Sequence, residues 1–95
     1  MTLTTEELGD TPNVEASTLD EVLASDGFGK FAILTKSKRE FMQAGNDWQP
    51  GKKCQEFLKK HDSDPWILEY RKGKQQFRAE GQVTLQQVRQ AFLSY

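Results

Sequence analysis

Cysteine and histidine are almost missing from this sequence, which has one of each, Cys54 and His61. A single cysteine cannot form a disulfide within the chain, as is typical of proteins in a reducing compartment. On one helix these two residues would lie two turns apart, about 10 Å, too far for a nucleophile and base pair. We therefore expect Cys54 to behave as a small buried hydrophobic residue, and we expect no enzymatic activity.

Long apolar runs, metal motifs and phosphate loops are missing as well. The longest apolar run, Phe31 to Leu34, is far shorter than the about 20 residues that span a bilayer. The N-terminus lacks a secretory signal, so we expect a cytoplasmic protein without membrane contact. The segment 61–64 has three potential metal ligands but lacks the glycine and further ligands of a calcium loop. Gly27 and Gly29 precede a predicted strand, not a helix, so we expect no cofactor.

Basic residues are absent from the first 29 positions, which contain seven acids. The remaining 66 residues contain thirteen basic and seven acidic side chains, so the two parts carry net charges of about -7 and +6. Residues 1–16 are polar, include Pro12 and show no periodicity, which predicts an acidic, disordered arm. Residues 17–95 are then expected to form a single domain. The arm is either simply solvated, which we favour, or a competitor for an anion-binding surface.

Three helices are predicted from apolar spacing and capping boxes, over residues 19–25, 52–60 and 85–95. The first begins after Thr18, and the last after Thr84. The middle helix places Cys54, Phe57 and Leu58 on one face, which favours packing on a sheet.

Two β-hairpins are predicted, over residues 30–44 and 66–80. In the first, a turn at 36–39 would pair Thr35 with Glu40 and Leu34 with Phe41. In the second, a two-residue turn at Lys72 and Gly73 would pair Leu68 with Phe77. One face of this hairpin is apolar, and the opposite face has Ile67, Glu69, Gln76 and Arg78. The expected fold is α+β, with a four-stranded antiparallel sheet covered by the N- and C-terminal helices.

The hairpin turns contain the strongest concentration of positive charge. In an up-and-down meander both turns would lie at one edge of the sheet, which would then carry Lys36, Lys38, Arg39, Arg71, Lys72 and Lys74. Such an edge could bind an acidic protein or nucleic-acid phosphates. Alternatively, the lysines at the strand ends serve only to keep the edges of the sheet soluble, which is their more common role.

Trp48 is the one aromatic residue with no evident burial partner, because it lies in a loop before Pro50 and Gly51. Tryptophan is enriched at interface hot spots, so Trp48 is a candidate anchor for a partner, unless it folds back over an apolar edge. A base-stacking surface would need aromatic residues beside the basic ones, and the polar face of the second hairpin has none. This weakens the nucleic-acid hypothesis.

Segments of the chain resemble small stand-alone bacterial α+β proteins, including proteins of the immunity type that neutralise toxins. The similar segments are 41–45, 68–73, 77–79 and 85–95. The resemblance implies a binding function and assigns no site residues. From sequence we expect a non-enzymatic domain that binds a protein or regulates one, with nucleic-acid binding as the alternative and an enzyme as a distant third hypothesis. The sequence does not indicate an oligomeric state.

Overall fold

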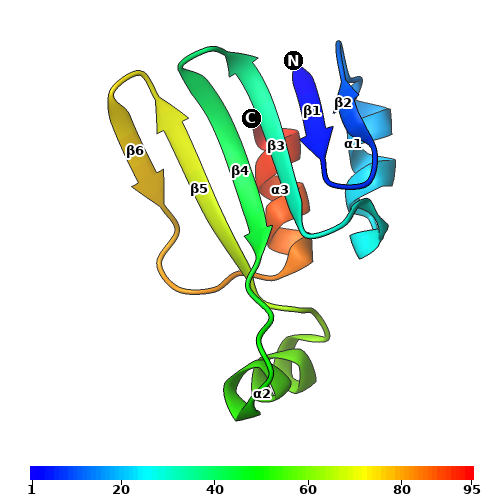
Figure 1. Ribbon diagram of the computed structural model, residues 1–95, viewed down its shortest axis with the longest axis vertical. Helices are drawn as coiled ribbons and strands as arrows, with labels where there is room; N and C mark the ends of the chain where they lie inside the picture. Colours follow the sequence, from blue (N-terminus) through cyan, green and yellow to red (C-terminus); the bar gives the residue numbers. More distant parts are fainter.

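A computed structural model describes residues 1–95, apart from the side chain of Asp26. It contains one six-stranded antiparallel sheet with the strand order β2-β1-β3-β4-β5-β6 (Figure 1). The strands are β1 (Thr2–Thr5), β2 (Gly9–Thr11), β3 (Phe31–Ser37), β4 (Glu40–Asn46), β5 (Trp66–Lys72) and β6 (Gln75–Arg78). The helices are α1 (Ala16–Leu23), α2 (Lys52–His61) and α3 (Leu85–Ser94), with a 3-10 turn η1 (Asp26–Phe28). None of the described helices is long and apolar enough to cross a membrane.

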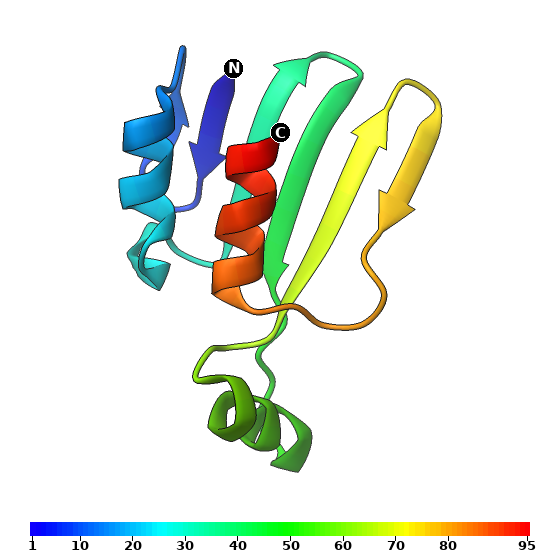
Figure 2. The same cartoon turned by 180° about the vertical axis from the view of Figure 1, so that it is seen from behind.

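The helices α1 and α3 lie side by side on one face of the sheet (Figures 1 and 2). The core lies between these helices and the sheet, and its fully buried side chains include Leu23, Leu34, Trp66, Val88 and Phe92. Burial alternates along β3, where Ala32 and Leu34 face the helices. The opposite face, which we call the open face, is covered by no helix of the described chain (Figure 1).

The broad α+β class is confirmed, whereas the predicted number of four strands is wrong. Both additional strands come from residues that we expected to form a disordered arm, since β1 pairs with β3 and β2 pairs with β1. Leu3 lies opposite Leu34 and is 1% exposed, and Thr5 is 3% exposed. Threonine counts as a polar residue, but its β-branched side chain suits a strand. The segment therefore resembled a polar arm while it contributed side chains to the core.

The first hairpin forms, but its register differs from the prediction by one residue. Thr35 pairs with Phe41 and Leu34 pairs with Met42, with an irregularity next to the turn at residues 38–39. A shift of one residue exchanges the faces of a strand. Phe41, which we expected opposite Leu34, lies instead on the open face.

The second hairpin keeps its predicted faces although its register is shifted by two residues. The turn is formed by Gly73 and Lys74, and Tyr70 pairs with Phe77. Gly73 has a φ of 62°, a conformation that glycine adopts without steric cost. Because side chains alternate with a period of two, the shift leaves the inward and outward residues unchanged.

The helices agree with the prediction in number and differ in detail. α1 begins at Ala16, three residues before the expected start, and Thr18 lies inside it. α3 has the predicted capping box, in which Thr84 and Gln87 exchange two hydrogen bonds. α2 forms at 52–61, but it extends beyond the end of the sheet and does not pack on its face (Figure 1). Of the residues of α2, only Cys54 is buried.

Candidate functional site

The turns of the two hairpins meet at one edge of the sheet. The Gly73 amide donates a hydrogen bond of 2.7 Å to the Arg39 carbonyl, so the turns are joined through the main chain. The pairing of Glu40 with Lys72 and of Phe41 with Arg71 fixes β4 and β5 in register up to the turns. The structure therefore brings together all six predicted cations, Lys36, Lys38, Arg39, Arg71, Lys72 and Lys74. We call this set the basic rim.

Most of the positive charge on the basic rim is unpaired. All six side chains are exposed. Lys36 Nζ lies 4.0 Å from Glu40 Oε1 and 5.7 Å from the centre of the Tyr95 ring. The other five cations make no ion pair with any described side chain. An edge with this excess of positive charge attracts anionic groups.

Tyr95 borders the basic rim on the helix side. Its ring packs edge-on against Tyr70 at 5.6 Å between ring centres. Burial, with smaller effects from Glu40 and Tyr70, raises the pKa of Tyr95 to about 12. The hydroxyl oxygen is buried and makes no hydrogen bond within the described structure. Tyr95 is therefore neutral at ordinary pH and does not offset the charge of the rim.

The open face carries apolar and aromatic side chains that were not among the binding residues predicted from sequence. Residues that lie directly opposite one another share a face, so Ile33 lies beside Gln43, and Gln43 beside Glu69. The same register places Phe31 and Ile67 on either side of Gly45. Phe31 is 38% exposed. The signal for this surface was the continuous apolar run from Phe31 to Leu34, which places apolar side chains on both faces of β3.

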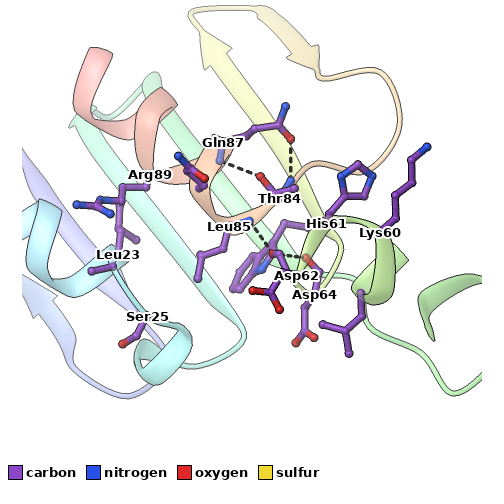
Figure 3. A pocket seen from close by; sticks show the side chains of 15 residues that line it. Leu23, Ser25, Lys60, His61, Asp62, Asp64, Thr84, Leu85, Gln87 and Arg89 are labelled. Atoms are coloured by element: carbon purple, nitrogen blue, oxygen red, sulfur yellow. Dashed lines mark hydrogen bonds between the residues drawn. The ribbon is translucent and has the colours of Figure 1, made fainter. Parts of the chain in front are cut away.

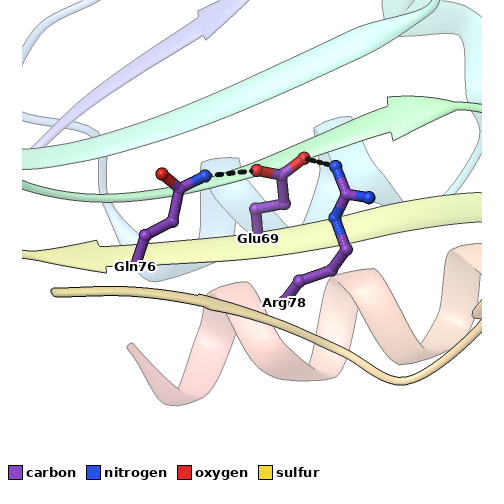
Figure 4. A network of polar contacts seen from close by, with 3 residues as sticks. All are labelled: Glu69, Gln76 and Arg78. Carbon is purple, nitrogen blue, oxygen red and sulfur yellow. Dashed lines mark hydrogen bonds and ion pairs between the residues drawn. The ribbon is translucent and has the colours of Figure 1, made fainter.

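Glu69 lies on the open face within a small polar network (Figure 4). Its carboxylate accepts a hydrogen bond of 2.9 Å from Arg78 and one of 2.7 Å from Gln76. The hydrogen bond from Arg78 is the main reason why the pKa of Glu69 lies below its ordinary value. Arg78 is therefore neutralised within the sheet, whereas five of the six rim cations make no ion pair with a described side chain.

Trp48 lies at the opposite end of β4 from the basic rim, in the segment that leads to α2. Seven residues of strand separate the two ends by about 20 Å. Its side chain is 36% exposed, and its amide donates to Asn46 Oδ1 at 2.8 Å. The structure thus exposes Trp48 as expected without joining it to the rim.

A cleft of about 940 Å³ lies between α2 and the ends of α1 and α3 (Figure 3). Its walls are mixed in charge and are lined by Lys60, His61, Asp62, Asp64, Thr84 and Arg89, among others. Several wall groups are already paired with the chain itself. Ser63 Oγ accepts from the Leu85 amide at 2.9 Å, and Arg89 Nε lies 2.6 Å from Asp20 Oδ1. This contact raises the pKa of Arg89 and lowers that of Asp20.

The thiol of Cys54 and the ring of His61 have separate surroundings. Cys54 Sγ accepts from the Gln49 amide at 3.4 Å and lies 3.7 Å from the Asp47 carbonyl oxygen. The His61 ring packs against Phe57 at 4.5 Å between ring centres. The described side chains include no group of three or more His, Cys, Asp or Glu residues placed to hold a metal ion.

Comparison with known proteins gives no match to this chain among protein-family models, curated proteins or solved structures.

Proposed function

We propose that this protein is a non-enzymatic binding domain that recognises an acidic protein through the basic rim. The observation that carries this proposal is the main-chain hydrogen bond between Gly73 and Arg39, which joins two cationic turns into one surface. Exposed charges of one sign accelerate association with an oppositely charged partner. A protein of the immunity type, which neutralises a toxin by binding it, would have a function of this kind.

Nucleic-acid binding is the second candidate, and the aromatic residues of the open face favour it. Phe31 and Phe41 offer surfaces on which bases could stack. Two observations favour a protein partner instead. Phe31 and Phe41 lie at opposite ends of the hairpin, too far apart for consecutive bases, and Arg78 is already paired with Glu69 and is not free to bind a phosphate.

Charge reversal on the basic rim tests the proposal. The rim variant carries Lys38→Glu, Arg39→Glu and Lys74→Glu. The matched control carries Lys52→Glu, Lys53→Glu and Lys60→Glu, the same change in net charge on α2. We expect tagged wild-type protein and the α2 control to co-purify the same acidic protein from cells of the source organism, and the rim variant to lose it. Recovery of no partner, or equal recovery with all three proteins, would contradict the proposal.

Electrophoretic retardation of labelled single-stranded RNA and double-stranded DNA at low salt separates the second candidate from the first. Phosphate binding would produce retardation that weakens steeply with salt and is lost in the rim variant. Under the protein-binding proposal we expect none at concentrations where the acidic protein is bound. Trp48→Ala belongs in the same series, because it weakens binding only if the partner reaches both ends of β4.

A further inference from the structure

Neither the backbone conformation nor the packing of the chain requires a glycine at position 45 of β4. It lies within a regular ladder, opposite Phe31 on one side and Ile67 on the other. It is not among the residues with positive φ, so its conformation suits any amino acid. Glycine weakens a strand, and it often marks a place where a ligand or another chain approaches the backbone closely.

Packing within the chain does not require this glycine either. Apart from Gly45 and its two neighbours in sequence, no residue would have a heavy atom within 4 Å of a Cβ atom at this position. Even the ring of Phe31, directly across the ladder, therefore leaves the position uncovered, although aromatic side chains often cover glycines in sheets. The position is consequently open toward the open face, and what approaches it comes from outside the chain.

A hollow of about 350 Å³ surrounds Gly45, and we call it the Gly45 hollow. Its lining includes Phe31, Ile33, Gln43, Gly45, Ile67 and Glu69. Three of these are large apolar side chains. The one charged group, Glu69, is matched by Arg78 and accepts hydrogen bonds from its neighbours, so the hollow offers no unpaired charge (Figure 4). An apolar side chain fits this lining better than a charged group does.

The basic rim limits the charge of any protein segment that places a side chain in the Gly45 hollow. Phe41 is four residues along β4 from Gly45, which corresponds to about 13 Å. Arg71 lies beside Phe41 on the same face, and the turn with Lys38 and Arg39 follows directly. A chain that enters the hollow and runs along the strands toward the turns therefore meets exposed cations at this distance. The incoming chain must be negatively charged where it meets these cations for the contact to be favourable.

We propose that the Gly45 hollow is a docking site for an apolar side chain of the acidic protein segment that the basic rim attracts. This inference rests on the proposed function and adds the second contact of the same partner. The rim raises the association rate, and the buried apolar side chain slows dissociation.

Two synthetic peptides provide the probe. Each has a run of glutamates at one end and, about four extended residues away, one test position that is leucine in the first peptide and serine in the second. The only isoleucines of the chain are Ile33 and Ile67, and both line the hollow. Selective methyl labelling of isoleucine for NMR therefore gives two signals that both report on this site.

We expect the leucine peptide to bind at least about tenfold more tightly than the serine peptide and to shift both methyl signals. Gly45→Val should abolish this difference and leave binding of the serine peptide unchanged, because it fills the hollow without touching the rim. Gly45→Ala is a milder variant with a smaller effect in the same direction. Thr2→Val is the matched control, since it adds an apolar group to the open face on β1, outside the hollow.

The outcomes separate the two proposals. Equal binding of both peptides, with unmoved methyl signals and weaker binding by the rim variant, overturns the docking site and leaves the proposed function intact. Failure of both peptides to bind overturns the proposed function together with the docking site. Methyl shifts with a single-stranded oligouridylate but not with the leucine peptide would overturn the assignment of the occupant. Circular dichroism and thermal melting of the Gly45 variants verify that they are folded.

Discussion

The two faces of the sheet contain apolar residues in alternation along the same strands, yet only one face is a core. On β3, Leu34 points to α1 and α3 and is 1% exposed, whereas Ile33, its neighbour in sequence, points to the open face and is only half-buried. The difference lies in what covers each face and not in the residue types. Hydrophobic residues therefore stabilise the fold on one side and remain free for contact on the other.

Truncation of these neighbours provides the strongest test of the comparison. Leu34→Ala removes contacts within a closed core and should lower the free energy of unfolding by about 2 to 5 kcal/mol. Ile33→Ala should lower it by about 1 kcal/mol or less, because part of the side chain is already in water. Denaturant titration of both variants measures the difference. Equal losses would mean that the open face is covered in solution.

A second contrast lies within the N-terminal segment. Leu3→Ala should destabilise the protein by about 2 to 4 kcal/mol, since Leu3 is 1% exposed and lies opposite Leu34. Leu8→Ala is the matched control, because Leu8 is 56% exposed in the turn between β1 and β2. It should lower the free energy of unfolding by about 0.5 kcal/mol or less. Thermal unfolding compares the two variants. Similar melting temperatures would contradict the docking of β1 in the sheet.

On the open face, Glu69 stabilises the sheet in a pH-dependent manner. Its pKa is below the ordinary value in the folded state, so its contribution is present at neutral pH and is lost as the pH falls through the folded-state pKa. Glu69→Gln should therefore cost about 0.5 to 1 kcal/mol near neutral pH and nothing in strong acid. Denaturant titrations across the acid range follow this difference. A constant difference would show that the carboxylate charge has no role.

On the covered face, Tyr95 should show the opposite dependence. Its pKa is raised to about 12, so its contribution to stability is complete below about pH 10, the unfolded-state pKa, and is lost as the pH rises toward the folded-state value. Tyr95→Phe removes a buried hydroxyl without a partner and should change stability near neutral pH by less than about 0.5 kcal/mol. The variant should lose less stability than wild type in alkali, as followed by circular dichroism at high pH.

The comparison of faces also shows what the sequence could and could not predict. The two hairpins and the capping box at Thr84 follow from local patterns, and the structure contains them. The meeting of the basic turns was expected only if the sheet is a meander, and the order β3-β4-β5-β6 meets that condition. The strands β1 and β2 could not be predicted in this way, because Leu3 becomes a core residue only through pairing with β3. The position of Phe41 on the open face was predicted wrongly, because a register error of one residue moves it to the other face.

The candidate binding residues also differ in how far they could be predicted from the sequence. The six rim cations could be predicted because turn positions and strand order determine their place. Trp48 could be identified as exposed, but its separation from the rim depends on the course of the chain into α2. The role that we propose for Gly45 required the structure, since only the empty space above it distinguishes it from a glycine that a turn requires.

The hydrogen bond between Gly73 and Arg39 uses only main-chain atoms. The spacing of the two turns therefore does not depend on which side chains they carry, except for the glycine that the turn conformation favours. Lys38, Arg39 and Lys74 can be replaced by residues of other charge or size while the backbone holds each position in place. Under the proposed function, substitutions at these positions would change the preferred partner without any change to the architecture that displays them.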